Sequence, residues 1–160
     1  MSGEGLTTCL WFDGQAEEAA KHYVAIFEDA ELGDVSHTTG VEPGAKEGDV
    51  LTVGFSLNGQ KFLGLNGGPE FTFNEAISFQ VFCADQEQVD YYWSRLSEGG
   101  EEGPCGWLKA KFGVSWQVVP AVLPRLIGDP DREKATRVTE AMLRMGKLKI
   151  AELEKAHAGS

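Results

Sequence analysis

Cysteine is scarce in this sequence. The three present, Cys9, Cys83 and Cys105, are widely spaced and form no Cys-x-x-Cys pair. An odd number of distant cysteines does not predict a disulfide framework, so a reducing compartment is favoured over an oxidising one. Cys9 and Cys83 fall in predicted strands, where we expect them to be small core hydrophobes. The first residues, Met-Ser-Gly-Glu-Gly, also lack the basic and apolar regions of a secretory signal, and together these features predict a cytoplasmic protein.

Long apolar runs and basic residues are scarce as well. No apolar stretch approaches the ~18–20 residues that span a bilayer. Lys and Arg number 14 against 25 Asp and Glu, which gives a net charge of −11. Such a charge repels the phosphates of nucleic acids and anionic membrane surfaces. We therefore expect neither a nucleic acid nor a membrane as a partner.

The sequence shows no sign of a bound cofactor. It lacks a Gly-x-Gly-x-x-Gly motif, the turn that binds nucleotide cofactors in doubly wound folds. The segment 64–68 is rich in glycine but leads into Pro69 and not into a helix, so we interpret it as a turn. The three histidines, His22, His37 and His157, have no His or acid partner at metal-ligand spacing. No cofactor is therefore predicted, and no residue stands out as catalytic.

What the sequence does contain is one unit twice. Residues 6–32 predict a strand, a polar break and an amphipathic helix, and residues 77–99 repeat this order about seventy residues later. A shift of 69 residues superposes Tyr23 on Tyr92. A repeat of this kind predicts two matching half-barrels with one cavity between them.

Each half continues with further strands. In the first half, residues 50–57 alternate in polarity, and Asn58-Gly59 is a strong hairpin signal before a strand at 60–65. The remaining predicted strands lie at 35–39, 107–111 and 114–119, with loops at 40–48 and 99–106. The order β-α-β-β-β, twice, predicts an α+β fold, in which two modules form a cupped mixed sheet or half-barrel pair.

The C-terminal part has no counterpart in the first half. Asp129-Pro130 predicts a helix start with Asp129 as the N-cap, and Gly146 interrupts the helical stripe that follows. That stripe must be buried on the barrel or against a second subunit. At 160 residues we expect a single domain, with module one at about 6–68, module two at about 76–120 and C-terminal helices at about 129–156.

Several stretches carry a family resemblance: CLWFDGQAEEAAKHY at 9–23, LNGGP at 65–69, ISF at 77–79, GWLKAKFGVSWQVVP at 106–120 and EAMLRMGKL at 140–148. They resemble PhnB-like proteins of the glyoxalase/bleomycin resistance/dioxygenase superfamily, also called the vicinal oxygen chelate superfamily. This branch is often labelled 3-demethylubiquinone-9 3-methyltransferase. The resemblance spans about 6–158 and implies paired βαβββ modules, a cupped sheet and usually a homodimer. The family usually has an acid where this sequence has Ala110.

The same resemblance locates the positions that hold a metal in superfamily enzymes such as glyoxalase I. They fall at Thr8, near Ser78, near Leu65 or Asn66, and near Gln117. Imidazole and carboxylate groups are absent from this set, and neutral oxygens bind transition metals weakly. We therefore expect no metal bound tightly by these residues.

Ligand binding is the function that the remaining residues favour. If the metal-equivalent positions point inward, strand alternation directs one side chain in two into the cavity. The predicted pocket residues are Thr8, Leu10, Phe12, Asn66, Ser78, Gln80, Trp107 and Gln117. Buried amides need polar partners, so Gln80 and Gln117 bond either a ligand or each other. Trp11 and Trp116 have the opposite parity, and we expect them to face the helices or an interface.

The sequence thus predicts a small-molecule-binding member of the superfamily that lacks an intact metal site and whose ligand is unidentified. Two enzyme alternatives stay open: a metal-dependent lyase, isomerase or oxygenase, and the methyltransferase of the family label. A structural protein with a filled barrel is a third.

Overall fold

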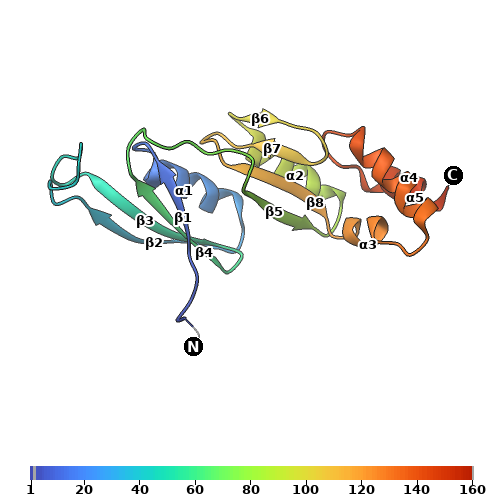
Figure 1. Cartoon of the computed structure of the whole chain (residues 1–160), viewed down its shortest axis with the longest axis horizontal. Coiled ribbons are helices and arrows are strands. Elements are labelled where there is room, and N and C mark those ends of the chain that lie inside the picture. The colour runs from blue at the N-terminus through green and yellow to red at the C-terminus, as the bar shows by residue number, and fades with distance from the viewer. Residues whose placement is uncertain (2, 160) are drawn as a thin grey trace. The chain divides into compact units, whose positions relative to one another are not determined.

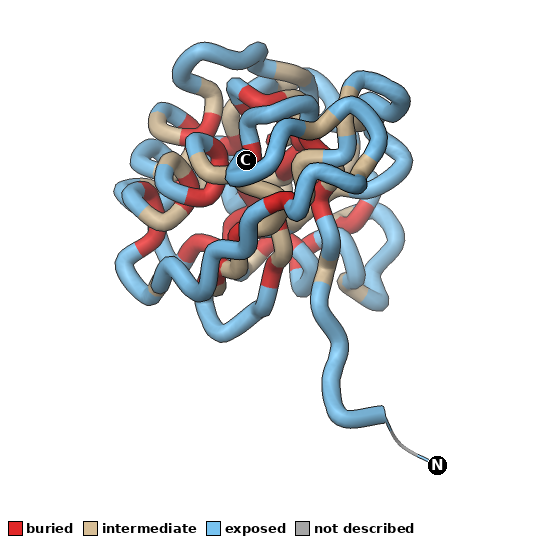
Figure 2. Tube along the Cα trace, turned by 90° about the vertical axis from the view of Figure 1, so that its left-hand side faces the viewer, coloured by how far each residue is buried: buried red, intermediate tan, exposed pale blue. Residues whose placement is uncertain are grey.

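The computed structural model describes residue 1 and residues 3–159. They form two compact units, one ending at Phe73 and the other beginning at Asn74 (Figure 1). Residues 3–7, which precede the first strand, are exposed throughout (Figure 2). Within the described residues, no helix combines the length and the apolar character needed to cross a membrane.

The first unit is a βαβββ module. It contains β1 (Thr8–Phe12), α1 (Ala16–Ile26), β2 (Ala30–His37), β3 (Val50–Leu57) and β4 (Gln60–Asn66). The sheet has the strand order β1-β4-β3-β2, in which β1 runs parallel to β4 and the other pairs are antiparallel. This is the element order that the sequence predicted, with β2 beginning five residues earlier than expected.

Local chemistry explains how α1 comes to lie on this sheet. Asn58 and Gly59 both have positive φ, 49° and 80°, which allows the tight turn between β3 and β4. A Cβ added to Gly64 on β4 would lie 3.1 Å from the Cβ of Ala16, so glycine there lets α1 approach the sheet closely. Tyr23 and Ile26 of α1 are then fully buried.

The second unit repeats the module. It contains β5 (Ser78–Cys83), α2 (Gln86–Ser97), β6 (Glu101–Glu102), β7 (Trp107–Lys109) and β8 (Ser115–Pro120). Its order, β5-β8-β7-β6, again has one parallel pair, β5 with β8. The two-residue β6 lies in a segment that the sequence indicated as a loop. The predicted α+β fold of two βαβββ modules is confirmed, with two four-stranded mixed sheets.

The alignment of the two modules differs from the sequence prediction by one or two residues. In the helices, a shift of 70 places buried Tyr23 on buried Trp93, whereas Tyr92 is only partly buried. In the strands the shift is 71, which places buried Phe12 on buried Cys83. The cause is the break between strand and helix, which has three residues in the first module and two in the second.

Three helices complete the second unit: α3 (Leu123–Ile127), α4 (Arg132–Leu143) and α5 (Ile150–Ala158). α3 was not predicted. Together with the end of β8 these elements enclose a second core, made of Val119, Leu123, Leu126, Val138, Leu148 and Leu153. The apolar stripe of the C-terminal part is therefore buried on its own unit.

The start of α4 lies two residues later than the sequence predicted. Asp131 is the N-cap, and its carboxylate accepts hydrogen bonds from the backbone N–H groups of Glu133 and Lys134. Asp129 is engaged elsewhere, because one of its oxygens accepts from the N–H of Asp131 and the other bonds His157 of α5.

Candidate functional site

The sheet of the second unit has two unlike faces. Trp93 of α2 donates to the Glu102 carboxylate, and Glu102 is in register with Leu108, so this side of the sheet faces α2. The adjacent positions, Trp107 and Lys109, point to the other side. We call that other side the open face.

The open face carries a row of hydrogen-bonded polar side chains. Gln80 is in register with Gln117, and Ser78 with Ser115. The Gln80 Nε2 donates to the Gln117 Oε1 at 3.3 Å, and the Gln117 Nε2 donates to the Ser78 Oγ at 2.8 Å. Two kinds of partner were expected for these glutamines, a ligand or each other, and in the structure the two glutamines bond each other. Gln80 is nonetheless exposed, so this bond does not lie in a filled core.

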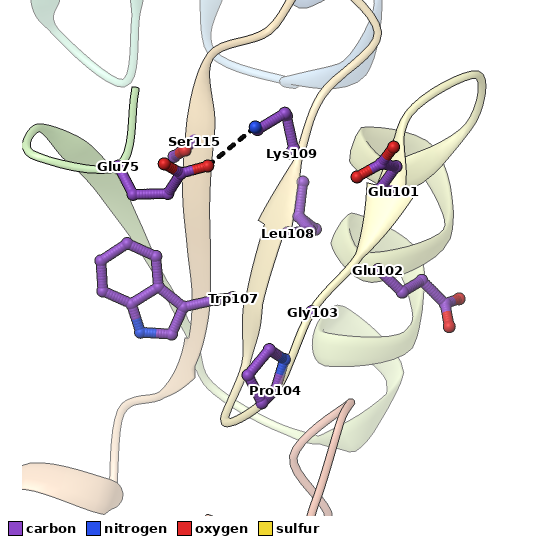
Figure 3. A pocket seen from close by; sticks show the side chains of 9 residues that line it. All are labelled: Glu75, Glu101, Glu102, Gly103, Pro104, Trp107, Leu108, Lys109 and Ser115. Carbon is purple, nitrogen blue, oxygen red and sulfur yellow. Dashed lines mark ion pairs between the residues drawn. The ribbon is translucent and has the colours of Figure 1, made fainter. Parts of the chain in front are cut away.

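A hollow of about 170 Å³ lies on the β7 side of this row (Figure 3). Its lining consists of Glu75, Glu101, Glu102, Gly103, Pro104, Trp107, Leu108, Lys109 and Ser115. The Lys109 Nζ lies 2.7 Å from the Glu75 Oε1. Ligand pockets for drug-sized molecules enclose ~300–1,000 Å³, so this hollow fits one ring or one acid group.

The electrostatics of the hollow centre on this ion pair. The hydrogen bond from Lys109 lowers the pKa of the Glu75 carboxyl, and the same bond raises the pKa of the Lys109 ammonium. Both groups are therefore charged at neutral pH. Ser115, beside them, is 2% exposed, and its Oγ has no hydrogen-bond partner among the described residues.

Four of the predicted pocket residues lie on this one open face: Ser78, Gln80, Trp107 and Gln117. Trp107 also lines the hollow. Phe82 and Val119 have the same parity as Gln80 and Gln117, but their exposure differs. Phe82 is 53% exposed, whereas Val119 is buried in the core with the C-terminal helices.

The other four predicted residues, Thr8, Leu10, Phe12 and Asn66, belong to the first unit. Leu10 and Phe12 are buried, and Leu10 is in register with Gly64, which contacts α1. The Asn66 Oδ1 accepts from the N–H of Ala16 at 2.9 Å, and its Nδ2 donates to the Val50 carbonyl at 3.0 Å. β1 thus turns Thr8, Leu10 and Phe12 toward α1, and Asn66 of β4, in register with Phe12, shares that side. This is the reverse of the expected orientation, because the strand-to-helix break has an extra residue.

The reversed parity also changes the surroundings of Trp11 and Cys9. Trp11 faces away from α1, and its indole N–H donates to the Gly68 carbonyl at 2.9 Å. The glycine-rich segment 64–68 was expected to be a turn, but its first three residues end β4, and only Gly67 and Gly68 follow the strand. A Cβ on Gly67 would lie 2.4 Å from the Trp11 ring, so glycine there makes room for this side chain. Cys9 is exposed and so is not a core hydrophobe. Trp116 is buried in register with Leu108 and faces α2, as expected.

The metal-equivalent positions do not form a transition-metal cage. Ser78 and Gln117 adjoin on the open face, but they offer only neutral oxygens, and both carry hydrogen bonds. Asn66 caps α1. Within the described part of the chain, no three His, Cys, Asp or Glu side chains lie close enough to hold a metal ion.

The ion pair of Glu75 and Lys109 was not predicted from the sequence. Lys109 shares the parity of Trp107 on the same short strand, so alternation could have found it. Glu75 precedes β5 in a turn, and no periodic signal points to its partner.

Comparison with known proteins gives the family. The family model described as 3-demethylubiquinone-9 3-methyltransferase matches residues 4–119. A PhnB protein from Bacillus cereus, whose name carries the same methyltransferase description, is 35% identical over 74% of this chain and 100% of its own, with a TM-score of 0.64. The chain therefore belongs to this family, the PhnB-like branch of the vicinal oxygen chelate superfamily.

More distant structures share the fold. Protein PA1353 from Pseudomonas aeruginosa is 16% identical over 74% of this chain and 98% of its own, with a TM-score of 0.60. The fosfomycin resistance protein FosX from Mesorhizobium loti is 14% identical over 74% of this chain and 92% of its own, with a TM-score of 0.52. No curated protein matches the chain significantly.

Proposed function

We propose that this protein binds a small molecule on the open face of its second unit. One observation carries the proposal: a row of amide and hydroxyl groups, Gln80, Gln117 and Ser78, runs beside a hollow lined by an indole and a lysine. Amides fix the orientation of a polar ligand edge, and an indole offers a flat apolar surface. The ligand class that fits is a planar molecule with a polar edge.

Two enzyme alternatives receive less support. A metal-dependent lyase, isomerase or oxygenase needs ligands that the metal-equivalent positions lack. The methyltransferase label calls for a cofactor site, but the mixed sheets differ from the doubly wound parallel sheet with a glycine-rich turn that typically holds such a cofactor. Titration with S-adenosylmethionine by calorimetry tests the label directly, and saturable binding would favour it.

A fragment screen by NMR tests the binding proposal. Planar polar fragments are expected to shift the backbone amide signals of Gln80, Gln117 and Trp107. Gln117→Leu removes the central amide of the row and should weaken these shifts. Gln60→Leu, at an exposed position on β4, is the matched control and should leave them unchanged. Fragments that shift only signals outside the open face would overturn the proposal.

Three parts of the proposal concern the whole chain. We propose that its two modules and C-terminal helices form a single glyoxalase-like domain, that it is a homodimer, and that it is cytoplasmic. The family resemblance supports the first two, and the cysteine usage supports the third. Light scattering that shows a monomer at micromolar concentration would refute the homodimer.

A further inference from the structure

The ion pair between Lys109 and Glu75 joins two elements of different kinds. Lys109 is on β7, where the ladder with β8 fixes its backbone. Glu75 lies in the turn before β5, and its side chain is 61% exposed. A solvent-exposed pair of this kind contributes at most ~1 kcal/mol, so little opposes moving the Glu75 carboxylate into solvent.

A second polar group lies beside this pair without a partner. Ser115 is in register with Lys109, and it lines the same hollow as Glu75 (Figure 3). The residue is 2% exposed, and its Oγ forms no hydrogen bond with any described residue. A buried hydroxyl without a partner carries a desolvation cost. An acceptor that reached it would remove that cost.

We propose that Lys109 and Ser115 form a subsite for the acid group of a ligand, a carboxylate or a phosphate, and that Glu75 occupies this subsite in the free protein. The ligand's oxyanion displaces the Glu75 carboxylate from Lys109 and also accepts from the Ser115 hydroxyl. This inference rests on the proposed function, and it adds the charge and chemical class of the ligand.

Two groups of the hollow can donate to an anion, although its lining also holds three carboxylates, Glu75, Glu101 and Glu102. Lys109 supplies three N–H donors and Ser115 supplies an O–H, so both fixed groups can donate. Of the other two carboxylates, Glu102 is held by the Trp93 indole on the α2 side, and Glu101 is in register with Lys109 and acts on its ammonium through charge alone. Trp107 provides an apolar surface for the body of the ligand. A small aromatic acid can accept from Lys109 and Ser115 through its acid group and pack on Trp107 through its ring.

Four probes with one ring and different charge test the inference: benzoate, phenyl phosphate, neutral benzamide and cationic benzylamine. Binding is followed at the backbone amide signals of Lys109 and Ser115 and at the Trp107 indole signal. Benzoate or phenyl phosphate should bind, and the comparison of the two distinguishes a carboxylate site from a phosphate site.

Lys109→Met should weaken that binding by about tenfold or more, as loss of a charge-assisted hydrogen bond does.

Glu75→Gln gives the sharpest readout, because it removes the competing carboxylate. It should strengthen acid binding about two- to fivefold, the range set by an exposed ion pair. Glu101→Gln removes the same charge from the same hollow, but Glu101 acts on Lys109 only through charge, whereas Glu75 forms the ion pair, so Glu101→Gln should change affinity less. Equal effects of the two variants would overturn the role of Glu75 as an internal competitor.

Ser115→Ala should weaken acid binding, with thermal unfolding as the check that each variant is folded.

The outcomes separate this inference from the proposed function. Binding of benzamide or benzylamine on the open face without binding of either acid would overturn the acid subsite and leave the small-molecule proposal standing. If none of the four probes shifts the open-face signals at millimolar concentration, and the fragment screen also finds nothing there, both fail.

Discussion

At the scale of single residues, the reactivity of a cysteine thiol depends on how far the fold buries it. Cys83 is buried, and this burial raises the pKa of its thiol to about 11. Cys9 is exposed on β1, and Cys105 is intermediate between them. Because the thiolate is the reactive form, exposure and pKa together decide which cysteine reacts.

This difference predicts the order of alkylation. At pH 8 only about 0.1% of a thiol with such a pKa is ionised. We expect iodoacetamide to modify Cys9 first in the native protein and Cys83 only after unfolding. Peptide mass mapping over a time course measures the order. Native labelling of Cys83 at the rate of Cys9 would contradict it.

A close contact in the first unit predicts the effect of adding one methyl group. In Gly67→Ala the new Cβ would lie 2.4 Å from the Trp11 ring, so the indole must move and lose its bond to Gly68. Overpacking of this kind costs about 1–3 kcal/mol in the free energy of unfolding. Urea denaturation measures the loss. Gly3→Ala is the control, since nothing lies within 4 Å of its added Cβ.

At the scale of elements, α5 is held to the rest of its unit by polar contacts at both ends. At its start, Gln86 of α2 accepts from the N–H of Ile150 at 2.8 Å and donates to the Leu148 carbonyl at 3.1 Å. At its end, Arg137 of α4 donates to the carbonyls of Ala156 and His157. These bonds fix where α5 lies, and its apolar side then packs in the second core.

The bond between Asp129 and His157 makes this attachment sensitive to acid. The hydrogen bond from His157 lowers the pKa of Asp129 below its ordinary value of 3.8. A carboxyl group whose pKa is lower in the folded state stabilises that state above the unfolded pKa, and the contribution is lost as the pH falls through the folded pKa. The protection of the α5 amides, which is their exchange rate relative to the intrinsic rate at the same pH, should therefore fall below about pH 3.8 in the wild type.

A variant isolates this effect. Asp129→Asn cannot titrate, so α5 should exchange faster than in the wild type at pH 5, and this difference should shrink as the pH falls below 3.8. Helix α1 in the first unit is the internal reference. A difference between the two proteins that stays constant with pH would contradict the role of Asp129.

At the scale of the whole molecule, the C-terminal helices build a hydrophobic core with the end of β8 inside the second unit. The family model ends at residue 119, so it covers the modules but not the helices that follow β8. Those helices still complete the second unit, because they bury Val119 at the end of β8. The additional core is therefore a structural part of that unit.

A pair of leucines tests the importance of this core. Leu153 is fully buried in it, and Leu153→Ala should lower the free energy of unfolding by about 2–5 kcal/mol through the cavity it leaves. Leu143→Ala makes the same chemical change at a side chain that is 62% exposed, and it should have little effect. Thermal denaturation compares the two. Equal shifts in Tm would show that the C-terminal helices do not contribute to the stability of the unit.

Much of the fold could be predicted from the sequence, because its signals are local. Asn58-Gly59 specifies a turn by its backbone freedom, and the alternation in 50–57 specifies a half-buried strand. The site was harder to predict. Alternation predicted that Ser78, Gln80 and Gln117 share one face of the second module, and they do. The same reasoning gave the wrong side of β1, where one extra residue before α1 reverses the parity.

The sequence by itself determined the element order of the modules apart from the short β6, the duplication, the hairpins and the family, because each depends on residues close together in the chain or on motifs read directly. Only the tertiary structure decided what meets on the open face. The contact of Glu75 with Lys109 joins residues 34 positions apart, and the unpartnered hydroxyl of Ser115 beside them depends on the pairing of β7 with β8. Contacts of this kind are set by how strands pair and which side chains are left uncovered, and no local pattern in the sequence encodes either.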